Sequence, residues 1–301
     1  MKNNKKLGAT LGLSAILLLA ACGNGEQIGN STNDTQTISE AVDYTIVGIE
    51  PGAGITQATD NMLKTYENLA GWEQETSSTA GMLTQLDQAI RNEKPILITG
   101  WSPHYKFTQH DLKYLEDPEG AMGGEESLHT IARKGFKEEM PNAYQILDNF
   151  YWEVEDMETV MYEALDSSIE EAATNWVENN QETVDGWLEG TEKVDGEQIE
   201  IVSLPWDTER ASSAVASIAL EQQGYEVSIT DVDVAVMFEA IANGEGDVSL
   251  GAWLPVTHGS FFENNEEDIE DLGPNLDGAR LGIVVPEYMD IDSIEDLEPK
   301  E

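Results

Sequence analysis

Three tryptophans each follow a predicted strand, in a short loop that contains proline: Trp101, Trp206 and Trp253. An indole ring is costly to expose to water, so tryptophan is rarely placed in three such loops without a use. Three indole faces can enclose a cation that donates no hydrogen bonds, such as trimethylammonium, and each face contributes roughly 0.5–2 kcal/mol. The alternative is that each ring packs against the edge of its domain. If the loops converge, the three rings predict a site for a quaternary ammonium ion.

A glycine-rich turn supplies a candidate site for the opposite charge. In Gly52-Ala-Gly-Ile55, the backbone can approach a ligand closely, and the helix that follows presents free N–H groups. This is an anion site with room for one carboxylate. His258, five residues after Trp253, could donate a second hydrogen bond or a charge. The alternatives are an ordinary helix start and a histidine buried in the core.

Other kinds of site are absent from the sequence. The glycine-rich turn is not followed by the Gly-Lys-Ser/Thr of a nucleotide-binding loop. Cys22 is the only cysteine, and the four histidines show no paired metal spacing. We therefore expect no cofactor, no metal and no catalytic triad. The histidines are His104, His110, His129 and His258.

The spacing of apolar residues indicates an α/β fold. It predicts strands at 44–49, 95–100, 199–204, 225–229, 247–250 and 281–285. It predicts helices at 55–69, 82–91, 126–135, 139–149, 155–166, 168–189, 210–223 and 234–242. Alternating strands and helices imply parallel sheets, in which ligands bind beyond the carboxyl ends of the strands.

The loops recur along the chain at a constant spacing. Gly54 aligns with Trp206, and Trp101 aligns with Trp253, in both cases 152 residues later. A repeat of this length predicts two similar α/β lobes, not a solenoid. Two facing lobes would bring the loops together across a cleft.

The first 22 residues have the features of an export signal. Lysines at the start precede an uncharged run from Leu7 to Ala21, which is too short for a permanent membrane span. The run ends in Leu19-Ala-Ala-Cys22, which resembles the lipobox of bacterial lipoproteins. This predicts a signal peptide at 1–21, lipidation at Cys22, and a tether at 22–42 that is rich in Gly, Asn, Ser and Thr. The alternative is an ordinary secretory signal with an incidental cysteine.

The chain is strongly acidic, with 59 acidic and 15 basic residues and a formal charge of −44. Such a surface repels nucleic acid and anionic lipid. Self-repulsion should destabilise the fold at low salt, and added salt should screen it. We therefore expect the unfolding midpoint to rise with NaCl concentration, as suits a salty or alkaline exterior. A midpoint that stays constant with salt would contradict this.

Five segments together resemble the glycine betaine-binding lipoproteins of osmoprotectant ABC importers, in the branch whose two halves have permuted order. The segments are Val47-Gly-Ile-Glu-Pro-Gly-Ala-Gly-Ile55, Ile98-Thr-Gly-Trp-Ser-Pro-His104, Arg133-Lys-Gly-Phe136, Leu204-Pro-Trp-Asp207 and Ala252-Trp-Leu-Pro-Val-Thr-His258. The resemblance implies a two-lobe, type II periplasmic-binding-protein fold that closes about a hinge. It implies a cation box of Trp101, Trp206 and Trp253, and a carboxylate site of Gly54, Ile55 and His258.

The resemblance also implies lobe boundaries, a function and partners. One lobe would hold 43–107 and 286–301, and the other 108–285. We expect a monomer, lipid-anchored at the extracytoplasmic face of the cell membrane. It would bind glycine betaine, and also proline betaine, and deliver them to a permease with a separate ATPase. The alternatives are a binding protein for choline or carnitine, or a lipoprotein enzyme acting on a small zwitterion.

Overall fold

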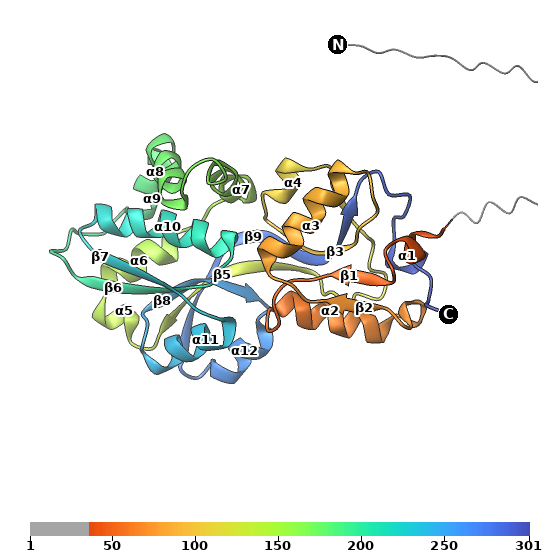
Figure 1. Ribbon diagram of the computed structural model, residues 1–301. Coiled ribbons are helices and arrows are strands. Elements are labelled where there is room, and N and C mark those ends of the chain that lie inside the picture. The colour runs from red at the N-terminus through yellow and green to blue at the C-terminus, as the bar shows by residue number, and fades with distance from the viewer. Residues whose placement is uncertain (1–35) are drawn as a thin grey trace, which may run out of the picture. The chain divides into compact units, whose positions relative to one another are not determined.

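A mixed sheet with helices on both sides organises the chain (Figure 1). The computed structural model describes residues 36–301, which form one unit. The predicted signal peptide and the lipidation site Cys22 lie outside the described residues. Within that part of the chain, no helix has both the length and the apolar character needed to cross a membrane.

A first group of elements comes from residues 38–114 and surrounds three parallel strands. The strands are β1 (Thr45–Val47), β2 (Glu73–Glu75) and β3 (Ile98–Ser102), with β1 in the middle. The helices are α1 (Ile38–Ala41), α2 (Gly54–Thr65), the short η1 (Glu67–Leu69), α3 (Thr79–Arg91) and α4 (Lys106–Gln109), and the short strand β4 spans Leu112–Tyr114. The predicted helices at 55–69 and 82–91 are confirmed.

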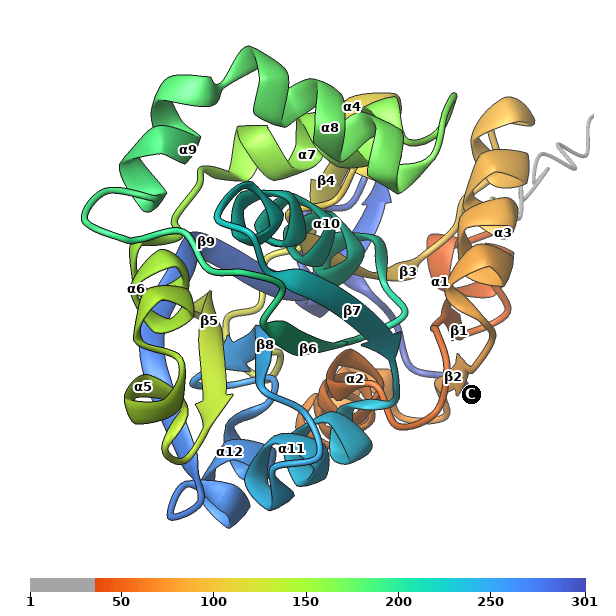
Figure 2. The same cartoon turned by 90° about the vertical axis from the view of Figure 1, so that its left-hand side faces the viewer.

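A second group surrounds β6 (Gln198–Ser203), which pairs in parallel with β7 (Glu226–Asp231) and β8 (Val248–Leu254). The helices of this group are α5 (Phe136–Glu139), α6 (Pro141–Asn149), α7 (Val154–Glu163), α8 (Ile169–Asn179), α9 (Gln181–Trp187), α10 (Asp207–Gln222), α11 (Val234–Asn243) and α12 (Gly259–Asn265). Helices α7 to α10 lie on one side of the three strands, and α11 and α12 lie on the other (Figure 2).

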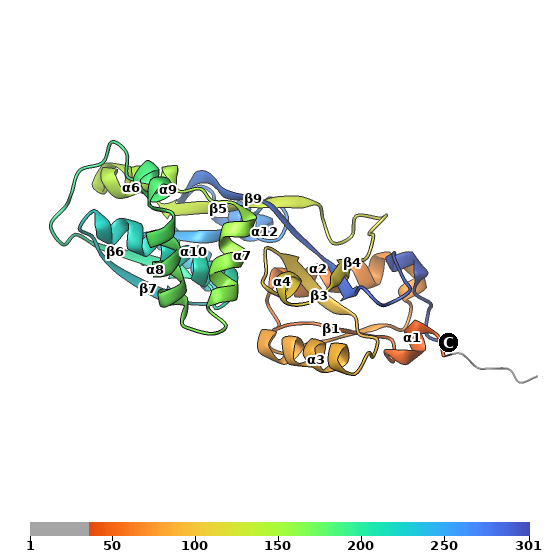
Figure 3. The ribbon, with the colours of Figure 1, turned by 90° about the horizontal axis from the view of Figure 1, so that it is seen from above.

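Two antiparallel strands join the groups: β5 (Glu125–Arg133) and the long β9 (Ile269–Pro286) (Figure 3). The strand order is β2-β1-β3-β9-β5-β8-β6-β7, with β4 also on β9. Strand β9 pairs with β5 over 269–280 and with β3 and β4 over 280–286. The lobe boundaries stay a prediction.

One predicted helix is wrong. Residues 126–135 were expected to be helical, but 125–133 form β5, which pairs with β8 on one edge and β9 on the other. Two of the buried positions of β5 are polar, Glu126 and Thr130, so the alternation of polar and apolar residues that marks a strand is weakened. The β9 strand is also much longer than the predicted 281–285. Gly273, Pro274 and Gly278 interrupt the sequence pattern before residue 281, and irregularities in the register with β5 accommodate the extra residues.

Helix α1 lies within the predicted tether at 22–42. Thr37 caps α1 with a reciprocal capping box to Glu40, and the Ser39 hydroxyl accepts a hydrogen bond from the backbone N–H of Glu298 (2.8 Å). The segment just before Asp43 is therefore attached to the C-terminal segment. In the second group, Trp152, Trp176 and Trp187 are buried, and the rings of the last two stack with their centroids 5.9 Å apart.

Candidate functional site

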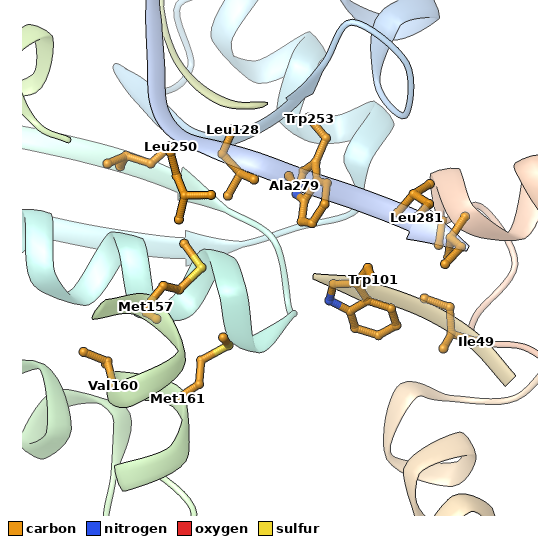
Figure 4. Close-up of a cluster of buried hydrophobic side chains, with 14 of the residues drawn as sticks. Ile49, Trp101, Leu128, Met157, Val160, Met161, Leu250, Trp253, Ala279 and Leu281 are labelled. Atoms are coloured by element: carbon orange, nitrogen blue, oxygen red, sulfur yellow. The ribbon is translucent and has the colours of Figure 1, made fainter. Parts of the chain in front are cut away.

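All six predicted ligand-binding residues line one pocket. The pocket encloses about 330 Å³ including its open mouth, and its surface is almost entirely apolar. It is lined by Ile49, Ala53, Gly54, Ile55 and Trp101 from the first group, by Trp206, Thr208, Trp253, Thr257 and His258 from the second, and by Leu281 of β9. Figure 4 shows the side chains of Trp101 and Trp253 in the same region, with Leu281 nearby. Residues 152 positions apart in the sequence thus meet in space.

The polar end of the pocket is the first turn of α2. Its N-cap residue is Ala53, which has no side chain that could accept a hydrogen bond from the helix. The carbonyl of Ala53 accepts the N–H groups of Thr56 and Gln57, which leaves the N–H groups of Gly54 and Ile55 for a ligand. The helix dipole adds partial positive charge at this point. An anionic group fits here without any basic side chain.

Trp206 carries a hydrogen bond between the two groups of elements. Its indole N–H donates to the Glu50 carboxylate (2.8 Å), and Glu50 also accepts the backbone N–H of Thr79 at the start of α3 (3.0 Å). Glu50 lies just after β1, whereas Trp206 is the N-cap of α10. The hydrogen bond from Trp206 to Glu50 thus holds this indole ring, one of the three that line the pocket, from the other group of elements.

Trp253 and His258 are joined in one tight loop between β8 and α12. The backbone N–H of His258 donates to the carbonyl of Trp253 (2.8 Å), and the backbone N–H of Trp253 donates to His258 Nδ1 (3.1 Å). Because Nδ1 accepts, the neutral ring carries its hydrogen on Nε2. Burial lowers the pKa of His258 to about 3, and its interaction with the Gly251 backbone only partly opposes this. At neutral pH the ring therefore offers a hydrogen bond and no charge, which excludes one of the two roles considered from the sequence.

Trp101 lies against a buried lysine. Lys106 Nζ donates to the Trp101 carbonyl (2.7 Å) and lies 4.2 Å from the centroid of the indole ring. Burial holds the pKa of the Lys106 ammonium well below its usual range, although Glu158 and Asp207 oppose this. The His104 ring meets Trp101 edge-on at 4.9 Å. Contacts on several sides thus fix the orientation of the Trp101 ring.

A buried carboxylate also positions the loop that faces Gly54. Glu126 of β5 accepts the backbone N–H groups of Val256 (3.3 Å) and Thr257 (2.9 Å), and the Thr257 hydroxyl as well. Burial raises the pKa of Glu126, and these three hydrogen bonds partly offset the rise. The loop is therefore held in place beside the first turn of α2.

Sequence reasoning missed Thr208 in the pocket wall and the charged residues behind the walls, namely Glu50, Lys106, Glu126 and Glu209. Nothing in the sequence marks the three glutamates among the 59 acidic residues of the chain. One local signal could have found Glu209. It stands three residues after the N-cap Trp206, where glutamate favours a helix start.

Comparison with known proteins places the chain in a family. Residues 26–179 and 197–301 match the family described as the substrate binding domain of the ABC-type glycine betaine transport system. A relative from Listeria monocytogenes serotype 1/2a (strain 10403S), the glycine betaine/carnitine transport binding protein GbuC, is 45% identical over 298 residues, which are 98% of each chain.

Two solved structures are also similar in sequence over about half of the chain. Lactococcal OpuAC, in a closed form with glycine betaine, is 43% identical over 50% of this chain and 59% of its own, with a TM-score of 0.46. The glycine betaine/L-proline-binding protein ProX from Borrelia burgdorferi is 32% identical over 50% of this chain and 58% of its own, also with a TM-score of 0.46.

The fold is α/β, as predicted, with a mixed sheet that has helices on both sides. The matched family serves transport and is not a family of enzymes. The match covers most of the chain and includes every residue that lines the pocket. The chain belongs to the family of substrate-binding domains of ABC-type glycine betaine transport systems.

Proposed function

We propose that the protein captures glycine betaine, and also proline betaine, between Trp101, Trp206 and Trp253 on one side and the first turn of α2 on the other. The observation that carries the proposal is the joint placement of three indoles and an uncapped helix N-terminus in one small apolar pocket. A quaternary ammonium ion loses little hydration on entering such a site and gains cation–π attraction from each ring. A bare ammonium would leave its hydrogen-bond donors unsatisfied there.

The carboxylate of the ligand would bind Gly54 and Ile55. Their backbone N–H groups supply hydrogen bonds and the helix supplies partial charge. The Nε2–H of neutral His258 is the third donor that we assign to this end. A carboxylate that is desolvated needs such partners, whereas choline has no carboxylate to use them.

Ligand binding would favour a closed state of the two lobes, which we propose as 43–107 with 286–301, and 108–285. The pocket takes residues from both groups of elements, so a ligand contacts both only when they are close together. A ligand shifts an opening equilibrium by its differential contacts with the two states. Strands β5 and β9, which connect the groups, are where bending would occur.

The remaining parts of the proposal concern location and partners. We propose that Cys22 carries lipid after cleavage of residues 1–21, so that the domain stays at the extracytoplasmic face of the cell membrane. A tethered domain has a high effective concentration near a permease in the same membrane. The protein would act as a monomer that delivers betaine to that permease, with a separate ATPase supplying the energy.

Calorimetry with four ligands tests the proposal. We expect glycine betaine and proline betaine to bind, with a change in tryptophan fluorescence. We expect choline to bind at least tenfold more weakly, since it leaves the donors of α2 unpaired, a cost of about 1–3 kcal/mol. If choline bound as tightly as glycine betaine, the proposed carboxylate site would be refuted. If glycine betaine produced neither heat nor a change in fluorescence, the proposed function would be refuted.

Carnitine is the fourth ligand for calorimetry. The relative from Listeria monocytogenes is named for both glycine betaine and carnitine. Carnitine has the same two charged groups on a longer chain, so the same walls would bind it only with a wider separation of the two lobes. We therefore expect carnitine to bind more weakly than glycine betaine, as the same calorimetry can measure.

A further inference from the structure

A buried carboxylate lies directly behind the aromatic wall formed by Trp253. Glu209, in the first turn of α10, is only 1% exposed. One of its oxygens accepts the indole N–H of Trp253 (2.6 Å), and the other accepts the hydroxyl of Thr208 (2.5 Å). Both of these donors line the pocket, whereas Glu209 itself does not. The carboxylate therefore contacts the site through two residues that a ligand would touch.

No cation among residues 36–301 forms an ion pair with this carboxylate. Arg210, the next residue on α10, pairs with Asp231 (2.7 Å), and Lys106 donates to the Trp101 carbonyl. His258 is neutral at physiological pH, as shown above. A buried charge without a partner is costly, and a buried titratable group beside a pocket is a candidate for a role in ligand binding.

The surroundings of Glu209 disfavour its ionised form. Burial raises the pKa of Glu209 to about 7, the hydrogen bonds from Thr208 and Trp253 oppose the rise, and the charge of Asp207 on the same helix adds to it. Helix α7 packs against α10, and its Glu158 is also acidic, so it offers Glu209 no positive charge. Glu158 accepts the backbone N–H of His104. The group thus lacks a positive partner that would favour its charged form.

We propose that Glu209 supplies the negative charge of the cation box, orients Trp253 through its indole N–H and is neutralised by the ammonium group of the bound ligand. This inference rests on the proposed function and adds a specificity-determining residue to it. A carboxylate that accepts the indole N–H polarises the ring and makes its faces more negative. The same charge favours a cationic ligand over a neutral one of equal shape.

The proposal couples ligand binding to a proton. A bound cation favours the ionised carboxylate, so it lowers the pKa of Glu209 from its value in the free protein. The affinity for the ligand is then highest at pH values above the pKa of Glu209 in the free protein. It falls as the pH drops through this pKa, because the protonated group must first ionise. With a free pKa of about 7, affinity should be about 30-fold lower at pH 5.5 than at pH 8.5 if the bound form stays ionised throughout.

The test is calorimetry with glycine betaine from pH 5.5 to 8.5 on the wild type and on E209Q, which keeps an acceptor for the Trp253 N–H but has no charge. At pH 8.5, E209Q should bind at least tenfold more weakly than the wild type, and at pH 5.5 the two affinities should converge. Near pH 7, wild-type binding should release about half a proton, measured in buffers of different ionisation enthalpy, and E209Q should release less. Thermal melts without ligand at pH 8.5 should show E209Q at least as stable as the wild type.

A second variant keeps the proposal testable if E209Q does not fold. T208V removes one hydrogen bond that stabilises the charged form, so the pH at which affinity falls should move upward. Parallel pH profiles of the wild type and E209Q, or an unshifted profile in T208V, would overturn the role of Glu209 while leaving betaine binding intact. A wild type that binds no betaine at any pH would instead refute the function itself.

Discussion

Replacing Gly54 with alanine is expected to weaken glycine betaine binding by about 100-fold, or ~2.7 kcal/mol, within the range that overpacking costs. A Cβ at this position would lie 2.4 Å from Thr257 Cγ2 and 2.9 Å from the Thr257 carbonyl oxygen. Gly54 starts α2, while Thr257 lies in the loop after β8. The added methyl group would therefore hold the cleft partly open, and the ligand could not contact both sides at once.

The facing loop cannot easily yield to this methyl group. Glu126 holds Thr257 by its backbone N–H (2.9 Å) and by its hydroxyl. The nearest backbone atom is the Thr257 carbonyl oxygen, so a change of the Thr257 rotamer removes only part of the clash. The backbone N–H groups of α2 remain in G54A. A loss of affinity in this variant can therefore be assigned to impaired closure of the cleft and not to a loss of hydrogen-bond donors.

The matched control is G259A, at the start of α12 and next to His258. A Cβ there meets no atom within 4 Å, so G259A should bind like the wild type. Calorimetry of both variants gives the affinities, and small-angle scattering with saturating ligand reports the closure. A G54A protein that binds and compacts like the wild type would show that the cleft does not close onto this contact.

The chemistry of the site could be predicted from sequence because it is carried by rare residue types. Trp101, Trp206 and Trp253 stand out by their cost of exposure and by the 152-residue repeat, which is a property of the fold. Gly54 stands out because a glycine-rich turn before a helix is a recognised pattern. These residues indicate their role without knowledge of their neighbours, and the structure places all of them around one pocket.

The polar residues behind the walls could not be predicted in the same way. Glu209 and Glu50 are two among 59 acidic residues, and their importance comes from contacts with indole N–H groups 44 and 156 positions away. Strand β5 was mistaken for a helix for a related reason, because its pairing with both β8 and β9 is non-local. Sequence patterns report local periodicity and residue type, whereas these features depend on which distant segments meet.

Replacing Trp206 with alanine is the second change with a large expected effect, a loss of tenfold or more in betaine affinity. The variant loses one aromatic face of the cation box, worth roughly 0.5–2 kcal/mol, and the hydrogen bond to Glu50 across the cleft (2.8 Å). Trp206 is only partly buried, unlike Trp101 and Trp253. Its removal therefore disturbs the core least, and a loss of binding can be assigned to the site.

The variant W206F separates the two contributions. Phenylalanine keeps an aromatic face but has no N–H, so its affinity should lie between those of the wild type and W206A. E50Q removes the charge at the other end of the same hydrogen bond, and the double variant W206F/E50Q should lose less than the sum of the single losses, since both act on one interaction. Additive losses would mean that Glu50 acts through Thr79 and α3, which it also contacts, and not through Trp206. If alanine at 101, 206 and 253 all left affinity unchanged, the pocket would have to bind its ligand without an aromatic box.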